Sequence, residues 1–369
     1  MSALSHPVSG HVHAMLVGAL CYLITVLSGC ASIIAPGHAV PKNPYAYQFE
    51  EYWYKFDRLY PYFDYKHVDW QAAYDQYRLQ ADKVTNEAQL VALLIRMTKP
   101  LRDVHVWFKS PDGKYLTTYN PARASDPNWD PTVIDKYVPD LSYYGGADWG
   151  FGHIKGYAYI FIADWNKHAL SLNEFDTVLT RFTSSRGLIL DVRMNEGGDE
   201  AMAYKLAAHF TDTPKLTEYY RYRNGPLPDD LGSPRPKYLN PSLGFHYTGP
   251  VMLLIGSDSF SSTENFIAAM QTLPNVTTIG ETTGGASGCP ETYKLAKGWQ
   301  YSVPVCYDMT SDHKVIEWNG IQPKITVTTT PADFRRGQDP VLGRALELLQ
   351  KQSGPAHPDT ILNSVSIQH

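Results

Sequence analysis

The chain has 369 residues, a formal net charge of −5 and 19% charged residues. This length allows one large hydrophobic core or two modest ones, and the slightly acidic balance argues against a nucleic-acid partner. The 26 tyrosines and 8 tryptophans fit either a groove for peptide or sugar or the interior of an ordinary aromatic-rich exported domain.

Residues 1–30 have the features of a targeting segment. The apolar run 15–27 is short for a membrane span and ends in Leu27-Ser28-Gly29-Cys30. This tetrapeptide matches the lipobox of bacterial lipoproteins, so we expect Cys30 to carry a lipid that anchors the protein to a bacterial membrane, on the periplasmic side or at the cell surface. A plain signal peptide or a buried apolar helix are the alternatives. Residues 31–45 would form a tether.

Residues 46–108 are predicted to form a small N-terminal helical subdomain. Apolar and aromatic residues recur at helical spacing over 47–60. Asp69 and the segment 85–87 offer N-caps for two further helices. Residues 109–149 have little periodicity, so we expect an irregular connection with one short strand.

Strand and helix patterns alternate over 150–350, which predicts βαβ units and a mostly parallel sheet. Strands are expected at 156–163, 187–193, 251–255 and 276–280, and helices at 173–182, 199–210, 262–273 and 339–350. The Pro/Gly-rich segment 223–242 is expected to form a lid or a binding rim. Residues 351–369 are expected to form a flexible tail.

Cys289 and Cys306 are the two cysteines that follow the targeting segment. The dipeptide Lys297-Gly298 favours a two-residue hairpin turn, and the two cysteines are equally far from it in the sequence. In such a hairpin the cysteines would face each other. Because exported proteins retain such bonds, we predict a disulfide. The histidines and cysteines lack metal-ligand spacing, and no phosphate-binding loop follows a strand, so neither a metal nor a cofactor is expected.

The strand at 251–255 leads to a helix that starts with Ser261-Ser262-Thr263-Glu264. In one interpretation Ser261 only caps the helix and Glu264 bonds back to it. In the other, its hydroxyl is a nucleophile beside free N–H groups that could hold an oxyanion. A nucleophilic serine needs a base and a group that orients the base, and His105 and Glu317 are candidates for these roles.

Seven ordered motifs resemble the tail-specific (C-terminal processing) protease family, in its tricorn-core and retinoid-binding-protein-like branch, over roughly residues 48–350. They are VDW (68–70), L-x-D-x-H (101–105), LILDVRMNEGG (188–198), S-S-T-E (261–264), IGETTGG (279–285), E-x-x-G-x-x-P (317–323) and PADFRRGQDPVLGRAL (331–346). The resemblance implies an α/β fold with a ClpP/crotonase-like β-α core and a mostly parallel sheet, preceded by the helical subdomain.

The resemblance also implies roles for particular residues. Ser261 would be the nucleophile, His105 the general base and Glu317 the carboxylate that orients the base. Ala286 stands where the Ser–Lys branch of the family has its lysine, so a histidine base is expected. A carboxylate beside the imidazole would raise its pKa.

The resemblance also implies an oxyanion hole whose donors come from two segments of the chain. The backbone amide of Ser262 and those of Gly197 and Gly198 would donate to the developing charge. The expected function is therefore an exported serine peptidase, a hydrolase that cleaves peptides or proteins by acyl transfer. The alternative is a non-catalytic binding module of the same fold, for an apolar or peptide ligand.

Overall fold

The computed structural model describes residues 35–120, 128–145, 148–166 and 171–353. The predicted targeting segment with Cys30, the start of the tether and the tail beyond residue 353 lie outside the described residues. Within the described ranges, no helix combines the length and apolar character that a membrane span requires.

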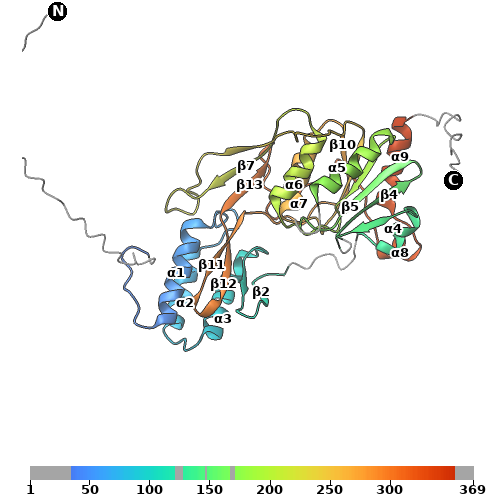
Figure 1. The fold of residues 1–369 in the computed structure, drawn as a ribbon. Helices are drawn as coiled ribbons and strands as arrows, with labels where there is room; N and C mark the ends of the chain where they lie inside the picture. Colours follow the sequence, from blue (N-terminus) through green and yellow to red (C-terminus); the bar gives the residue numbers. More distant parts are fainter. Residues whose placement is uncertain (1–34, 121–127, 146–147, 167–170, 354–369) are drawn as a thin grey trace, which may run out of the picture. The chain divides into compact units, whose positions relative to one another are not determined.

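Three helices open the described chain, α1 (Pro44–Leu59), α2 (Trp70–Ala81) and α3 (Glu87–Thr98), and the short η1 (Lys99–Leu101) follows (Figure 1). The predicted cap Asp69 accepts a hydrogen bond from Ala72 N at 2.8 Å. The first helix starts earlier than its apolar periodicity predicts, because Asn43 caps it and a proline occupies its first position.

Part of the predicted tether is packed rather than free. His38 Nδ1 lies 2.9 Å from Glu50 Oε2, and its ring stacks on Trp53 with the centroids 5.6 Å apart. Both partners belong to α1. Residues 35–43 therefore contribute contacts to the helical part of the molecule.

The helical subdomain includes residues from the C-terminal half of the chain. An antiparallel sheet in the order β11-β12-β1-β2 contains β1 (Trp107–Lys109), β2 (Tyr115–Thr117), β11 (Pro290–Lys294) and β12 (Gln300–Pro304). Tyr301 of β12 packs on Tyr52 of α1 with ring centroids 4.7 Å apart, and Val303 lies in the same buried cluster. The predicted boundary at residue 108 thus does not enclose everything that forms this core.

Cys289 and Cys306 form a disulfide, with Cα atoms 5.5 Å apart. The predicted two-residue turn is wrong, because the connection spans 295–299 and includes η4 (Ala296–Gly298). The register of β11 and β12, continued by one residue beyond the pair Pro290 and Pro304, would put Val305 opposite Cys289. Gly288 O instead accepts hydrogen bonds from both Val305 N and Cys306 N, at 2.7 and 3.1 Å. This bulge brings Cys306 opposite Cys289.

The larger core is built on a seven-stranded sheet in the order β14-β10-β9-β6-β5-β4-β3. Its strands are β3 (Ser142–Tyr144), β4 (Trp149–Ile154), β5 (Tyr157–Ile162), β6 (Leu188–Asp191), β9 (Val251–Ile255), β10 (Val276–Gly280) and β14 (Ile325–Thr326). Strands from β14 to β5 run parallel, β4 pairs antiparallel with β5, and β3 pairs antiparallel with β4. The predicted α/β class with a mostly parallel sheet is confirmed.

Helices cover both faces of this sheet, so its strands are apolar on both sides. One buried cluster joins the sheet to α5 (Leu172–Arg181), α6 (Glu200–Ala207) and α7 (Ser262–Gln271), with the short η2 (Phe182–Ser184) and η3 (Ala208–Phe210). The opposite face packs on α4 (Pro131–Tyr137) and α9 (Pro340–Ser353). Helix α8 (Pro331–Arg335) precedes α9.

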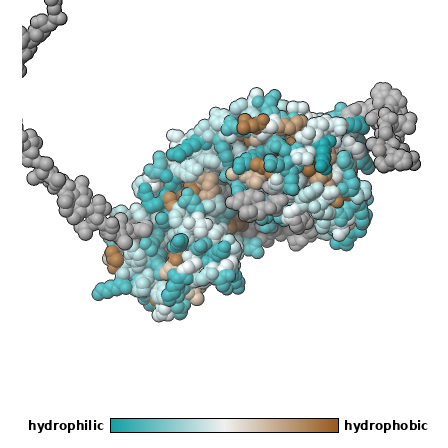
Figure 2. All heavy atoms as spheres, viewed as in Figure 1, coloured by the Kyte–Doolittle hydropathy of each residue, from teal (hydrophilic) through white to brown (hydrophobic). Residues whose placement is uncertain are grey.

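A third sheet, in the order β13-β7-β8, contains β13 (Cys306–Thr310), β7 (Lys215–Tyr222) and β8 (Arg235–Leu239). The segment 223–242, expected to form a lid or a binding rim, therefore includes the strand β8. Hydrophilic residues cover most of the face seen in Figure 2, and apolar residues appear there in small groups. Scattered exposed apolar residues are ordinary and mark no site on this face.

Candidate active site

Ser261 stands where the chain passes from β9 into α7. Its backbone has φ 55° and ψ −127°, a conformation that residues with a Cβ rarely adopt, and its side chain makes no helix-capping bond. Its Oγ instead lies 3.0 Å from His105 Nε2. Glu264, the other half of the predicted capping box, accepts the amides of Gly285 and Ala286 at 2.8 Å each. The capping interpretation of the Ser261 side chain is therefore wrong.

The Gly-Gly turn packs directly against Ser261. Gly197 has φ +112°, and a Cβ there would lie 2.8 Å from Ser261 Cβ, so glycine alone permits this approach. Its N–H donates to Asn195 Oδ1 at 2.9 Å, which corrects the prediction that this amide faces a substrate. In the part of the chain that the structure describes, the amides of Gly198 and Ser262 have no acceptor. These two remain as candidate oxyanion donors.

His105 is held at both ring nitrogens. Nδ1 lies 3.1 Å from the carbonyl oxygen of Ser287, and Nε2 faces Ser261 Oγ. A carbonyl only accepts hydrogen bonds, so Nδ1 carries the hydrogen and Nε2 is free to accept the serine proton. Burial lowers the pKa of His105, against the opposing effects of the Asp103 charge and the Ser287 carbonyl. The neutral form that a base needs is favoured.

Glu317 does not contact the His105 ring, which corrects the predicted direct Ser-His-Glu arrangement. Its Oε2 accepts the Ser287 amide at 3.0 Å, and its Oε1 accepts from Lys66 Nζ at 2.6 Å. Ser287 therefore stands between the carboxylate and the base, with its N–H toward one and its C=O toward the other. Burial and the neighbouring Asp103 charge raise the pKa of Glu317, and the ammonium of Lys66, which favours the ionised carboxylate, opposes this rise. Because Glu317 does not contact the ring, the predicted rise of the His105 pKa through such a contact does not occur.

The segment that carries Ser287 is fixed by Glu264. Besides the amides of Gly285 and Ala286, this buried carboxylate accepts the hydroxyl of Thr283. Burial raises the pKa of Glu264 to about 7, and these donors oppose the rise. The contacts hold the loop in the position that separates Glu317 from His105.

Glu264→Ala is expected to lower the free energy of unfolding by about 3 kcal/mol, because it leaves three buried donors without an acceptor. Urea denaturation followed by fluorescence measures this loss. Glu347→Ala, on the exposed side of α9, is the matched control and should leave the transition unchanged. Equal transitions for the two variants would contradict the role given to Glu264.

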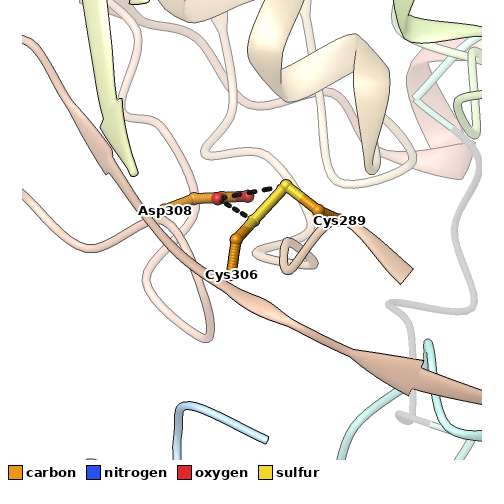
Figure 3. A group of neighbouring side chains, drawn as sticks. All are labelled: Cys289, Cys306 and Asp308. Carbon is orange, nitrogen blue, oxygen red and sulfur yellow. Dashed lines mark hydrogen bonds between the residues drawn. A yellow bond between two sulfur atoms is a disulfide. The ribbon is translucent and has the colours of Figure 1, made fainter. Parts of the chain in front are cut away.

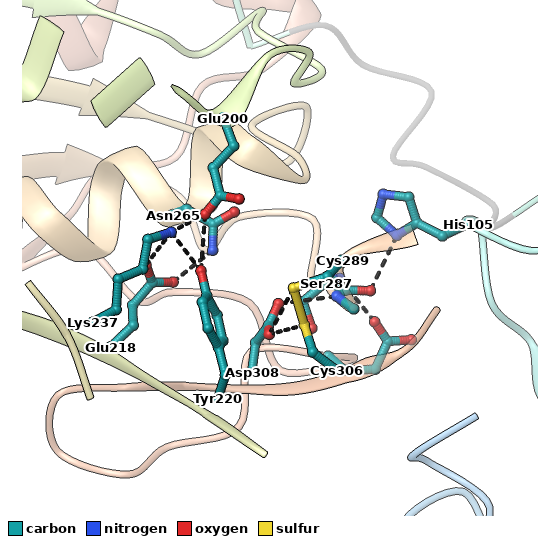
Figure 4. The surroundings of a disulfide bond; sticks show 12 residues. His105, Glu200, Glu218, Tyr220, Lys237, Asn265, Ser287, Cys289, Cys306 and Asp308 are labelled. Carbon is teal, nitrogen blue, oxygen red and sulfur yellow. Dashed lines mark hydrogen bonds and ion pairs between the residues drawn. A yellow bond between two sulfur atoms is a disulfide. The ribbon is translucent and has the colours of Figure 1, made fainter. Parts of the chain in front are cut away.

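A cavity of about 400 Å³ opens beside Ser261 and His105. The Gly198 and Ser262 segments line it together with Glu200 of α6 and the disulfide residue Cys289. In the view of Figure 4, the disulfide lies between two groups of side chains. His105 and Ser287 are on one side, and the polar residues Glu218, Tyr220 and Lys237 are on the other. The cavity has room for a substrate side chain next to the serine.

Asp308 lies beside the disulfide (Figure 3). Its Oδ1 is 2.6 Å from Cys306 Sγ, and its Oδ2 accepts the Gly288 amide at 3.0 Å. Two cysteines and an aspartate are metal-ligand types, but disulfide sulfurs carry no thiolate charge to offer a metal. The group instead fixes Gly288, the neighbour of the residue whose carbonyl holds His105.

Two protein-family models match the chain. Residues 156–327 match the model of peptidase family S41, and residues 41–99 match that of the tricorn protease C1 domain. The first of these ranges contains Ser261 and Glu317, and His105 lies between the two ranges.

Two curated relatives have similar sequences. The carboxy-terminal processing protease CtpA of Bacillus subtilis (strain 168) is 27% identical over 141 residues, which are 38% of this chain and 28% of the relative. The tricorn protease of Thermoplasma volcanium is 28% identical over 193 residues, which are 52% of this chain and 17% of the relative. The matches therefore span less than a third of each relative's own length.

Solved structures share the fold. A candidate peptidase from Parabacteroides merdae ATCC 43184 matches with a TM-score of 0.72 and 28% identity, over 88% of this chain and 100% of that one. Mature CPAF in complex with lactacystin matches with a TM-score of 0.61 and 12% identity, over 84% and 97% of the two chains. The second likeness concerns the fold alone.

Proposed function

Because the chain belongs to the tail-specific protease family, peptidase family S41, we propose that it is a serine peptidase that cleaves peptide or protein substrates by acyl transfer. The observation that carries this proposal is the 3.0 Å contact between Ser261 Oγ and His105 Nε2. It is supported by the strained backbone of Ser261 and by the cavity beside it.

In the proposed reaction, His105 Nε2 takes the proton of Ser261 as Oγ attacks the substrate carbonyl carbon. The amides of Gly198 and Ser262 donate to the carbonyl oxygen as it becomes negative. The imidazolium then gives its proton to the leaving amine, and an acyl-enzyme forms. A water molecule, deprotonated by the same nitrogen, hydrolyses this ester and restores the serine.

Glu317 has an indirect role in this proposal. Its carboxylate orients the Ser287 peptide, whose carbonyl accepts the Nδ1 hydrogen of His105. This fixes the tautomer of the base and stabilises the imidazolium, which is the function that a directly bonded carboxylate has in other serine peptidases. The negative charge remains one peptide unit away from the ring.

The function is tested by peptide hydrolysis with Ser261→Ala and with the matched control Ser184→Ala. Ser184 is an exposed serine at the end of η2, away from the cavity. We expect the first variant to lose activity by at least ten-thousandfold and the second to retain it. Hydrolysis that persists in Ser261→Ala would reject the acyl-transfer proposal.

We further propose that the protein is exported and anchored by lipid at Cys30. The lipobox-like sequence supports the anchor, and the disulfide fits an oxidising compartment. Cys30→Ser should move the protein from the membrane fraction to the soluble fraction or block its processing, as measured by immunoblotting of fractionated cells. Cys21→Ser, within the apolar run, is the control. The same membrane-bound distribution in wild type and Cys30→Ser would rule out the anchor.

A further inference from the structure

Lys66 lies in the turn between α1 and α2, and its side chain has no solvent-exposed area. Its Nζ lies 2.9 Å from Asp103 Oδ2 and 2.6 Å from Glu317 Oε1. Removing three charges from water is unfavourable, and apolar side chains of similar volume often stabilise a fold as well. The presence of this ion group therefore suggests a role beyond stability.

Both carboxylates of the group also hold the base. Asp103 Oδ1 accepts the backbone N–H of His105 at 2.9 Å. Glu317 Oε2 accepts the amide of Ser287, whose carbonyl binds His105 Nδ1. Lys66 thus contacts both of the arms that fix His105, one at its backbone and the other at its ring.

We propose that Lys66 and Asp103 are positioning residues for His105. The ammonium holds the two carboxylates together, and its charge offsets theirs, so the ring stays oriented and neutral. This inference rests on the proposed role of His105 as the base. It adds a contribution of the helical subdomain to a site whose serine lies in the larger core.

The surroundings of the ammonium are aromatic. The ring centroids of Tyr60, Tyr62 and Trp318 lie 5.6, 5.4 and 5.0 Å from Lys66 Nζ, and the Tyr60 hydroxyl donates to Asp103 Oδ2 at 2.8 Å. Ring faces favour a cation but do not neutralise it. The charge of Lys66 is therefore balanced by the two carboxylates.

The two positioning residues act on the imidazole in opposite directions. The charge of Asp103 raises the pKa of His105 and that of Lys66 lowers it, while burial, the largest effect, also lowers it. Loss of the Asp103 charge should therefore lower the pKa of His105 further, and loss of the Lys66 charge should raise it. A purely structural role predicts no such pair of opposite shifts.

The test uses the full-length protein as Asp103→Asn and Lys66→Met, with the exposed Lys83→Met as control. The imidazole pKa is read by NMR titration, and the His105 signal is assigned by its loss in His105→Gln. We expect shifts of about half a pH unit, downward in Asp103→Asn, upward in Lys66→Met and absent in Lys83→Met. The acid limb of kcat/KM should move in the same directions, with a plateau lowered on the order of tenfold.

Asp103→Asn preserves the side-chain shape, so it decides the question even if Lys66→Met does not fold. An unchanged or raised His105 pKa in Asp103→Asn would overturn the inference, as would shifts of the same sign in both folded variants. The titration needs no peptidase activity. A protein that shows the opposite shifts but hydrolyses no peptide would therefore retain this inference while losing the proposed function.

Discussion

Replacing His105 with glutamine is expected to lower kcat/KM on a peptide substrate at least a thousandfold, with little change in the fold. Glutamine is similar in length and has an N–H that can donate to the carbonyl of Ser287. It cannot take a proton from Ser261 at neutral pH. The measurement is steady-state hydrolysis of any peptide that the wild-type protein cleaves, with circular dichroism as the check on folding.

The pH dependence gives this prediction a second readout. His105 must be neutral to act, so kcat/KM should rise with pH through the histidine pKa and then level off. Because burial lowers that pKa, the midpoint should lie below the ordinary value of about 6.5. Near-normal activity in His105→Gln, or a midpoint in the lysine range near pH 10, would contradict a histidine base.

Replacing Arg193 with methionine should reduce the free energy of unfolding by about 3–5 kcal/mol, because it leaves buried carboxylates without a counterion. Arg193 is fully buried just after β6. Its Nη2 lies 2.7 Å from Asp191 Oδ2 and 2.8 Å from Asp339 Oδ2, and its Nη1 donates to Asn128 O at 2.8 Å. The guanidinium thus joins the end of a central strand to the residue before α9.

Chemical denaturation monitored by tryptophan fluorescence measures this loss. The matched control is Arg96→Met on α3, where the arginine is exposed and a large effect is not expected. If both arginine variants unfold at the same denaturant concentration as the wild type, the buried ion group does not stabilise the fold as described.

Local signals in the sequence predict the central strands of the larger core but not all of its elements. The segment 109–149, expected to be an irregular connection with one short strand, contains α4 and β3, and the strands β4 and β14 are also not predicted. Alternating apolar runs act over a few residues, and so do polar caps such as Asp69 in the helical subdomain, so they predict elements directly. The pairing of β12 with β1 depends instead on contacts between distant segments, such as Tyr301 on Tyr52. Periodicity contains no information about such pairs. The predicted helical subdomain therefore lacks the strands that come from the C-terminal half of the chain.

The sequence likewise predicts only part of the site. The order of the motifs brought Ser261 and His105 into consideration, and the structure places their side chains 3.0 Å apart. Ser287 acts through its backbone, which every residue type has, so its identity offers no signal. Lys66 lies in a turn where a lysine is normally solvated, and only the tertiary structure buries it between Asp103 and Glu317.

Mass spectrometry after treatment with a fluorophosphonate measures whether Ser261 is the activated nucleophile that we propose. We expect one adduct, mapped to Ser261, that is absent in Ser261→Ala and forms much more slowly in His105→Gln. An unlabelled wild-type protein, or an adduct on another serine that survives Ser261→Ala, would contradict the claim and favour a non-catalytic binding module.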